Sequence, residues 1–227
     1  VISLSFKTTS TDTSTRYALV NTSGTVNLIK STSWGGTWSI VSLSDKTRTG
    51  NLLCNYFING TDDGFSGGED GILLKTTNGG SDWKLIETGV TFSFKQLFFP
   101  SATGFLDSGI AIADDGKLYR TTDAGKRWRP ASSIGNYKSF HFYDRTNGYG
   151  FAVGDDGLIA RIGWVSGKLK IIKLNPPQII TDDFTAVSFS SADDGIVVGT
   201  NSKIYKISQG SGNILLYPVT NSPGSGS

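Results

Sequence analysis

The chain has 227 residues with 21 basic and 19 acidic side chains. Its net charge of +2 does not indicate binding to nucleic acid or to an anionic membrane. Hydrophobic residues make up 37% of the sequence, which is ample for a core, and the apolar runs are too short to span a bilayer. The 29 glycines against 6 prolines, with many Ser, Thr, Val and Ile residues, favour short strands joined by tight turns. We therefore predict an all-β protein with no nucleic-acid partner and no membrane insertion.

Three octets of similar sequence recur along the chain. STSWGGTW, TTNGGSDW and TTDAGKRW begin 45 residues apart, at Ser31, Thr76 and Thr121. Each octet has a hydroxyl residue first, a short polar residue third, glycine fifth and tryptophan eighth. These positions are Ser31, Ser33, Gly35, Trp38, Thr76, Asn78, Gly80, Trp83, Thr121, Asp123, Gly125 and Trp128. A fixed period of this length is typical of a repeat architecture.

Each octet belongs to a longer unit that contains four short strands. In the third unit an aromatic strand ending at Phe99 precedes the apolar strand GIAIA, an Asp-Gly turn, the strand KLYR, the octet and the strand RWRPA. Residues 158–161 and 203–206 keep the KLYR pattern where the octet itself has decayed, so five units are visible. Four antiparallel strands recurring about every 40 to 45 residues are typical of a propeller blade.

We therefore predict a β-propeller of five four-stranded antiparallel blades. The blades cover approximately residues 1–45, 46–90, 91–135, 136–175 and 176–220, which form a single domain over 1–220, and residues 221–227 form a flexible tail. Residues 213–219 supply the last strand of the fifth unit, so no strand is exchanged between the chain ends to close a ring. Two interpretations stay open: five blades closed by packing alone, or part of a larger propeller.

The octet resembles the Asp-box, or BNR, motif of sialidases, sortilin-type receptors and many secreted propellers, Ser/Thr-x-Asp-x-Gly-x-Thr-Trp. The fuller unit, seen in GILLKTTNGGSDW at 71–83 and GFAVGDDGLIAR at 150–161, is similar to the repeats of the photosystem II stability and assembly factors. The resemblance covers residues 52–165 well. It implies a propeller that supports protein assembly, and an octet that lies away from the face where ligands usually bind.

The third octet residue could suggest a catalytic acid or a calcium ligand, since it is Asp123 in the third unit. Ser33 and Asn78 hold the same position in the other units, and neither can act as a general acid. All three can accept backbone N–H bonds in a turn, while the following glycine supplies a positive φ. We interpret the octet as turn chemistry.

Acidic pairs occur at one position of three consecutive units, before the third strand. They are Glu69, Asp70, Asp114, Asp115, Asp155 and Asp156. If the ring forms, these carboxylates share one face, where they could attract a cation or a basic partner. The alternative is that Asp-Gly is the preferred two-residue hairpin turn and the other acid is solvated.

Catalytic groups are scarce in this sequence. The predicted innermost strands contain no Asp or Glu, so a carboxylate-pair glycosidase is not expected. His141 is the only histidine, which excludes a three-histidine zinc site, and Cys54 is the only cysteine, which excludes an internal disulfide. We predict no enzyme, no metal and no cofactor.

Basic residues concentrate in the third and fourth units. They are Arg120, Lys126, Arg127, Arg129 and Arg145, and arginine replaces the usual threonine of the octet at position 127. Arginine favours planar, bidentate recognition of carboxylates and phosphates, so this group could be a patch for partner docking. The alternative is a solvated stripe on the strands.

Our functional prediction is a non-enzymatic scaffold for protein–protein interaction or assembly. The alternative is a carbohydrate-binding or adhesive domain of a cell or virion surface, in which Phe65, Phe105, Tyr137 and Tyr149 would stack on sugars; a degenerate glycosidase comes third. The chain contains no methionine, even at position 1, which we interpret as a processed chain, a fragment, or a protein whose start is not included. Together with the resemblance to secreted propellers, this predicts an extracytoplasmic location.

Overall fold

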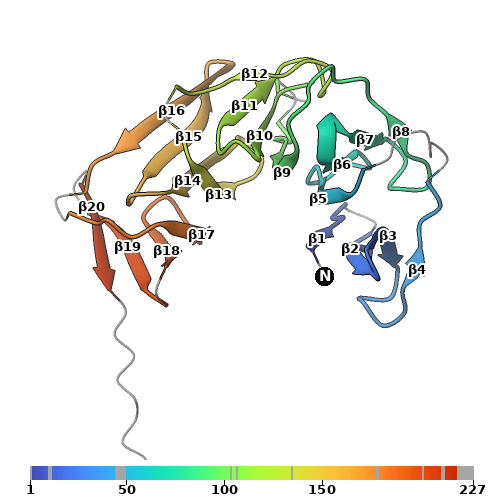
Figure 1. Ribbon diagram of the computed structural model, residues 1–227, viewed down its shortest axis with the longest axis horizontal. Coiled ribbons are helices and arrows are strands. Elements are labelled where there is room, and N and C mark those ends of the chain that lie inside the picture. The colour runs from blue at the N-terminus through green and yellow to red at the C-terminus, as the bar shows by residue number, and fades with distance from the viewer. Residues whose placement is uncertain are drawn as a thin grey trace, which may run out of the picture. The chain divides into compact units, whose positions relative to one another are not determined.

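The protein folds into five four-stranded antiparallel sheets, each built from four strands that are consecutive in the chain (Figure 1). The computed structural model describes residues 2–9, 12–43, 50–102, 104–105, 107–133, 135–176, 179–200, 202–210 and 213–218. The predicted tail at 221–227 lies outside these residues. Within the described part of the chain, no helix is long and apolar enough to cross a membrane.

The strand bounds follow the four-strand pattern of the sequence. The first sheet contains β1 (Ser3–Phe6), β2 (Arg16–Thr22), β3 (Thr25–Ser31) and β4 (Ser39–Ile40). The second contains β5 (Leu52–Phe57), β6 (Gly64–Gly68), β7 (Leu73–Thr76) and β8 (Lys84–Leu85), and the third β9 (Phe94–Phe98), β10 (Gly109–Ala113), β11 (Leu118–Thr121) and β12 (Arg129–Pro130). The fourth contains β13 (Tyr137–Asp144), β14 (Tyr149–Gly154), β15 (Ile159–Val165) and β16 (Lys168–Leu174), and the fifth β17 (Phe184–Phe189), β18 (Asp194–Gly199), β19 (Ile204–Gly210) and β20 (Asn213–Pro218). These sheets are the five blades that the repeat predicts.

The chain packs as two compact units. Unit 1 comprises Val1–Gly135 and Arg145–Asn147, and unit 2 comprises Asn136–Asp144 and Gly148–Ser227. Unit 1 therefore contains the first three blades, and unit 2 contains the fourth and fifth.

Aromatic rings join neighbouring blades within each unit. In unit 1, Tyr17 of the first blade stacks on Phe57 of the second at 4.5 Å between ring centroids, and Phe65 of the second stacks on Phe99 of the third at 3.9 Å. In unit 2, Phe151 stacks on Phe189, also at 3.9 Å. Stacked aromatic pairs of this kind add about 0.5–1.5 kcal/mol beyond the area they bury. The core of each unit therefore lies between its blades.

A glycine in the second strand makes room for the aromatic ring of the first strand. A side chain at Gly109 would lie 2.4 Å from the Phe99 ring, and one at Gly195 would lie 2.5 Å from the Phe189 ring. Gly64 has the same relation to Phe57. The glycine that recurs at the start of the second strand is therefore a packing requirement of the blade.

The fourth blade shows what replaces the octet where its sequence has decayed. Ser166 and Gly167 have φ values of 50° and 76° and join β15 directly to β16. Two residues with positive φ form the tight turn that suits a twisted hairpin. Because the turn is short, both strands extend to seven residues, whereas β8 and β12 have two.

Candidate functional site

The octet loop is closed by its own side chains. In the third blade, the Thr121 hydroxyl accepts the N–H groups of Asp123 and Gly125 at 3.3 and 3.0 Å and donates to Asp123 Oδ1 at 2.9 Å. Asp123 Oδ1 also accepts the N–H of Arg127 at 2.9 Å. Gly125 has a φ of +89°, which a residue with a side chain rarely adopts. The recurring pattern of residue types thus serves the turn.

The other two octets form the same bonds with different acceptors. Asn78 Oδ1 accepts the Asp82 N–H at 2.9 Å, and the Ser33 hydroxyl accepts the Thr37 N–H at 3.0 Å. The first residue is the acceptor for the fifth in both loops, Thr76 for Gly80 and Ser31 for Gly35. An amide, a hydroxyl and a carboxylate are therefore interchangeable here, because each offers an oxygen acceptor.

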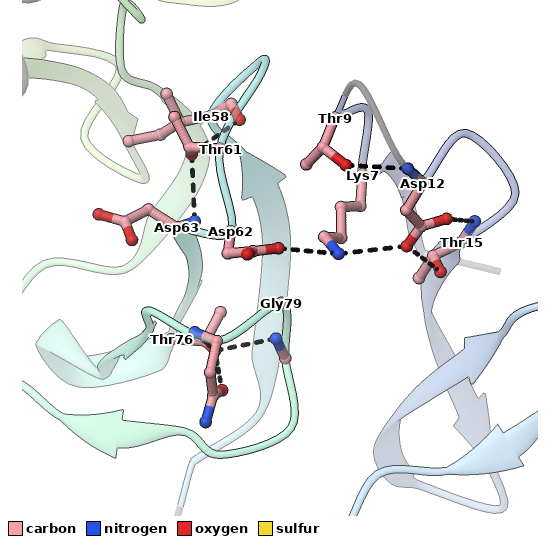
Figure 2. Close-up of polar contacts among 12 residues, drawn as sticks. Lys7, Thr9, Asp12, Thr15, Ile58, Thr61, Asp62, Asp63, Thr76 and Gly79 are labelled. Carbon is pink, nitrogen blue, oxygen red and sulfur yellow. Dashed lines mark hydrogen bonds and ion pairs between the residues drawn. The ribbon is translucent and has the colours of Figure 1, made fainter.

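A partly buried cation links the first blade to the second. Figure 2 shows the Lys7 ammonium group between the carboxylates of Asp12 and Asp62, at 3.1 and 2.8 Å. Asp12 also accepts the Thr15 hydroxyl at 2.6 Å. Partial burial alone would raise the pKa of Asp12, but the bonds from Thr15 and Lys7 outweigh it and hold that pKa well below 3.8. Burial alone would lower the pKa of Lys7, but Asp62 and Asp12 raise it above 10.5.

We expect Lys7→Met to lower the free energy of unfolding by about 1–2 kcal/mol at neutral pH, since charged hydrogen bonds between the blades are lost. The depressed pKa of Asp12 means that this contribution is present above the unfolded pKa near 3.8 and is lost as the pH falls further. The raised pKa of Lys7 means that it is also lost as the pH rises past 10.5. Urea unfolding from pH 2 to 8 measures the difference, and Lys75→Met, which removes a 3.6 Å pair with Asp63, is the control. An equal loss of unfolding free energy in both variants, or a loss that does not depend on pH, would contradict a stabilising role for the contacts of Lys7 with Asp12 and Asp62.

Three of the four acidic side chains of unit 1 have hydrogen-bond partners within their own blade. Glu69 accepts the Asn51 N–H at 2.9 Å, and Asp114 accepts the Ser93 N–H at 3.1 Å, so each carboxylate holds the segment before the first strand of its blade. Asp115 pairs with Lys117 and accepts the Tyr119 hydroxyl, both at 2.9 Å. Asp70 has a φ of 49° and forms the turn with Gly71. Three of the four carboxylates therefore have a partner in their own blade, and Asp70 contributes to the turn through its backbone.

The acidic pair of unit 2 has comparable contacts. Asp155 pairs with Lys138 at 3.2 Å, and the Asp156 N–H donates to Asp183 Oδ1 at 3.0 Å. Asp156 and Gly157 both have positive φ, as the Asp-Gly hairpin requires. Over the described residues, no three His, Cys, Asp or Glu side chains gather as a site that could hold a metal ion.

Three arginines converge on one small pocket of the third blade. The pocket has a volume of about 190 Å³ and is lined by Arg120, Thr122, Asp123, Arg127 and Arg129. Arg120 and Arg129 lie directly opposite each other on β11 and β12, and both are exposed. Like charges in this arrangement destabilise a sheet, so the pair is unfavourable for the fold. We call Arg120, Arg127 and Arg129 the arginine cluster.

The one carboxylate of the pocket is already engaged. Asp123 Oδ2 lies 2.6 Å from Arg127 Nε, while its other oxygen closes the octet. Partial burial alone would raise the pKa of Asp123, but the hydrogen bonds from Arg127 and Thr121 outweigh it and hold that pKa below 3.8. Asp123 therefore stays ionised at neutral pH and neutralises one of three guanidinium groups, which leaves a net positive pocket.

A larger cavity lies beside the arginine cluster, between the second and third blades. It has a volume of about 780 Å³ and shares Thr122 and Asp123 with the arginine pocket. Lys75, Lys84 and Lys126 line it, together with Asp82 and Asp107. Lys75 and Lys84 are opposite each other on β7 and β8, as Arg120 and Arg129 are on the next blade. The sequence prediction missed Lys75 and Lys84. A signal was present, because in the second and third blades two basic residues nine positions apart flank an octet.

The five predicted basic residues do not form one group. Lys126 lines the larger cavity, and the arginine cluster lines the smaller one. Arg145 lines neither: its guanidinium carbon lies 5.2 Å from the centre of the Tyr56 ring, and it donates to the Phe57 carbonyl at 3.2 Å. Arg145 therefore holds backbone within unit 1.

Two of the four aromatic residues predicted to stack on sugars are buried. Phe65 and Tyr137 are 0% and 1% exposed, so that prediction is wrong for them, because the first packs on Phe99 and the second lies in the interior. Phe105 and Tyr149 are partly exposed. Burial therefore prevents Phe65 and Tyr137 from stacking on a sugar.

His141 and Cys54 are both committed to packing between blades. His141 Nδ1 accepts the N–H of Phe189 at 3.1 Å, which joins the fourth blade to the fifth. Cys54 is buried, and burial raises the pKa of its thiol to about 12, so it is not a thiolate nucleophile at neutral pH.

Comparison with solved structures shows the propeller fold. The chain is similar to "YCF48 bound to D1 peptide", with a TM-score of 0.65 and 21% identity over 94% of this chain and 65% of that one. It is also similar to YCF48 from Cyanidioschyzon merolae, with a TM-score of 0.63 and 12% identity over 95% of this chain and 84% of that one. A third similar structure is the GH74 enzyme of Niastella koreensis, with a TM-score of 0.71 and 17% identity over 96% of this chain.

The chain spans 65% of the length of the first of these proteins and 38% of the GH74 enzyme. No protein-family model matches the sequence. No curated protein sequence matches it either. The likenesses, all at low identity, establish the β-propeller fold and leave function to be argued from the site.

Proposed function

We propose that the protein is a non-enzymatic interaction module that docks an acidic segment of a partner protein on the arginine cluster. The observation that carries the proposal is the opposed pair Arg120 and Arg129, exposed beside Arg127 in one pocket. The sheet gains nothing from two like charges in register, so their placement suits an external anion. Guanidinium groups bind carboxylates through two parallel hydrogen bonds, which suits glutamate and aspartate side chains.

The larger cavity extends this positive surface. Lys84 on β8 and Lys126 within the octet of the third blade both line this cavity and are exposed. A segment that reaches from the arginine cluster into this cavity would meet further cations. The similarity to a structure with the name "YCF48 bound to D1 peptide" supports peptide binding as the mode of interaction. The extracytoplasmic location belongs to the same proposal and rests on the resemblance to secreted propellers.

The test uses a fluorescein-labelled hexaglutamate peptide and measures anisotropy. We expect binding that weakens as salt is added, and a loss of at least about tenfold in affinity in the double variant Arg120→Gln/Arg129→Gln, since each charged contact contributes about 1–3 kcal/mol. The matched control is Lys170→Gln/Lys173→Gln, which removes the same charge from two exposed residues of β16.

Two results would refute this function. One is equal weakening in both double variants, which would mean that the peptide senses only net charge. The other is the absence of peptide binding at low salt. Hydrolysis of chromogenic glycosides by the purified protein would separately refute its non-enzymatic part.

A further inference from the structure

A lysine side chain occupies the junction between the first and second blades. Lys7 follows β1, and its ammonium group lies 2.8 Å from the Asp62 carboxylate of the second blade. It also lies beside the second octet, since a Cβ built on Gly79 would be 2.9 Å from Lys7 Nζ. The Asp62 carbonyl accepts the Gly79 N–H at 2.9 Å, so the carboxylate and the octet are held together. These two residues mark the place of the ammonium group.

The next junction, between the second and third blades, has a cavity at the same place. Asp107 and Ala124 are the repeat equivalents of the two marker residues, 45 positions further along the chain, and the Asp107 carbonyl again accepts the Ala124 N–H at 2.9 Å. Both line the cavity of about 780 Å³. Ile58 follows β5 as Lys7 follows β1, so the position that supplied the ammonium group is apolar here. Both walls of the cavity belong to unit 1.

Asp107 differs from the other aspartates that line this cavity. Asp82 accepts the side-chain amide of Asn78 at 2.8 Å. Asp123 lies 2.6 Å from Arg127 Nε. The Asp107 side chain has no hydrogen bond or ion pair to any residue that the structure describes. Hydrogen bonds between a carboxylate and a cation are about twice as strong as neutral ones, so Asp107 offers an unused counter-ion.

The lysines of the cavity restrict the kind of molecule that can use this counter-ion. Lys75 pairs with Asp63 at 3.6 Å. Lys84 and Lys126 line the cavity as well, and their ammonium groups have no partner among the described residues. They repel a ligand that is only basic, whereas Asp107 repels one that is only acidic. A segment that carries side chains of both signs therefore complements the cavity best.

We propose that the cavity binds a lysine side chain of the partner protein, with Asp107 as the counter-ion. The inference rests on the proposed function, because this lysine belongs to the segment that places an acidic residue on the arginine cluster. The two sites adjoin, since Thr122 and Asp123 line both. A short extended segment therefore reaches from one to the other. The Lys7 ammonium group, at the equivalent place one junction earlier, is the structural precedent for the bound lysine.

Two fluorescein-labelled peptides test this inference by anisotropy with the full chain. One has lysine and glycine before hexaglutamate and the other has glycine and lysine after it, with the label at the glutamate end. Each is compared with the same peptide containing acetyl-lysine, which has no ammonium charge. We expect at least one lysine peptide to bind about fivefold more tightly than its acetylated counterpart. Attraction of the arginine cluster for net negative charge alone predicts the opposite order, because lysine makes the peptide less acidic.

Asp107→Asn is expected to abolish the advantage of lysine over acetyl-lysine. Hexaglutamate should bind this variant at least as tightly as it binds the unaltered protein, since a repelling carboxylate is gone. The matched control is Asp70→Asn, which removes the same charge from an exposed turn of unit 1 outside the cavity and should keep the advantage. Both substitutions are at exposed positions, and neither removes a backbone hydrogen bond.

Two outcomes would overturn the inference. One is that neither lysine peptide binds more tightly than its acetylated counterpart, and the other is that the advantage of lysine persists in Asp107→Asn. In both cases the proposed function still stands if Arg120→Gln/Arg129→Gln weakens the binding of hexaglutamate. A protein that binds none of these peptides would overturn both, so the two failures are distinguishable.

Discussion

Trp128→Ala is expected to lower the free energy of unfolding by about 3–5 kcal/mol, the range for loss of a buried large aromatic. The Trp128 side chain is 7% exposed and lies 5.2 Å from the Phe94 ring and 6.3 Å from the Phe99 ring. Its indole N–H donates to the Gly125 carbonyl at 2.9 Å, so alanine also leaves one octet bond unmade. The variant should open the contact between the second and third blades.

Trp38→Ala is the matched control, because Trp38 holds the same octet position and donates to the Gly35 carbonyl at 3.0 Å. It is 39% exposed, so we expect a loss of only about 1 kcal/mol. Urea denaturation, followed by far-UV circular dichroism, compares the free energies of unfolding of the two variants. Similar losses in both would show that the indole bond dominates and that burial between blades does not.

Gly71→Ala is expected to destabilise unit 1 by about 2–4 kcal/mol, which combines overpacking with a left-handed backbone. Gly71 has a φ of +72°, and a Cβ there would lie 2.1 Å from the Val90 carbonyl oxygen. The Gly71 N–H donates to the Phe92 carbonyl at 2.9 Å. The obstacle is backbone held by this hydrogen bond, so relief requires the segment before β9 to move.

Gly24→Ala separates the two costs, because Gly24 has a φ of +87° and a Cβ there would meet nothing within 4 Å. We expect it to lose about 1 kcal/mol, from the backbone conformation alone. Thermal unfolding of both variants measures the difference in midpoint. If Gly24→Ala is as damaging as Gly71→Ala, the close approach of Val90 is not what requires glycine at position 71.

The blade pattern could be predicted from the sequence because the octet works through local hydrogen bonds. Thr121, Asp123 and Gly125 lie within five positions of one another, and their bonds close one turn. Hydrogen bonds over so few positions depend on the residue types of the segment itself and can be predicted without knowing the rest of the fold. The positive φ of the fifth-position glycine follows from the same local geometry.

The candidate site depends on pairing between strands, which the sequence indicates less directly. Arg120 and Arg129 are nine positions apart and meet only because the octet brings β11 and β12 into register. Arg145 has the same residue type but stacks on Tyr56 instead. The sequence prediction grouped these arginines because basic residues are dense in this part of the chain. Charge density along the chain does not show which side chains converge.

The sequence by itself determined the number of blades, the order of their strands and the turn chemistry of the octets, because a repeated local pattern folds in the same way at each occurrence. Only the tertiary structure decided which copy of a repeated residue is covered. Trp38 and Trp128 are equivalent in sequence, yet one is 39% exposed and the other 7%. Burial depends on the neighbouring blade, and a side chain's own segment does not encode that neighbour.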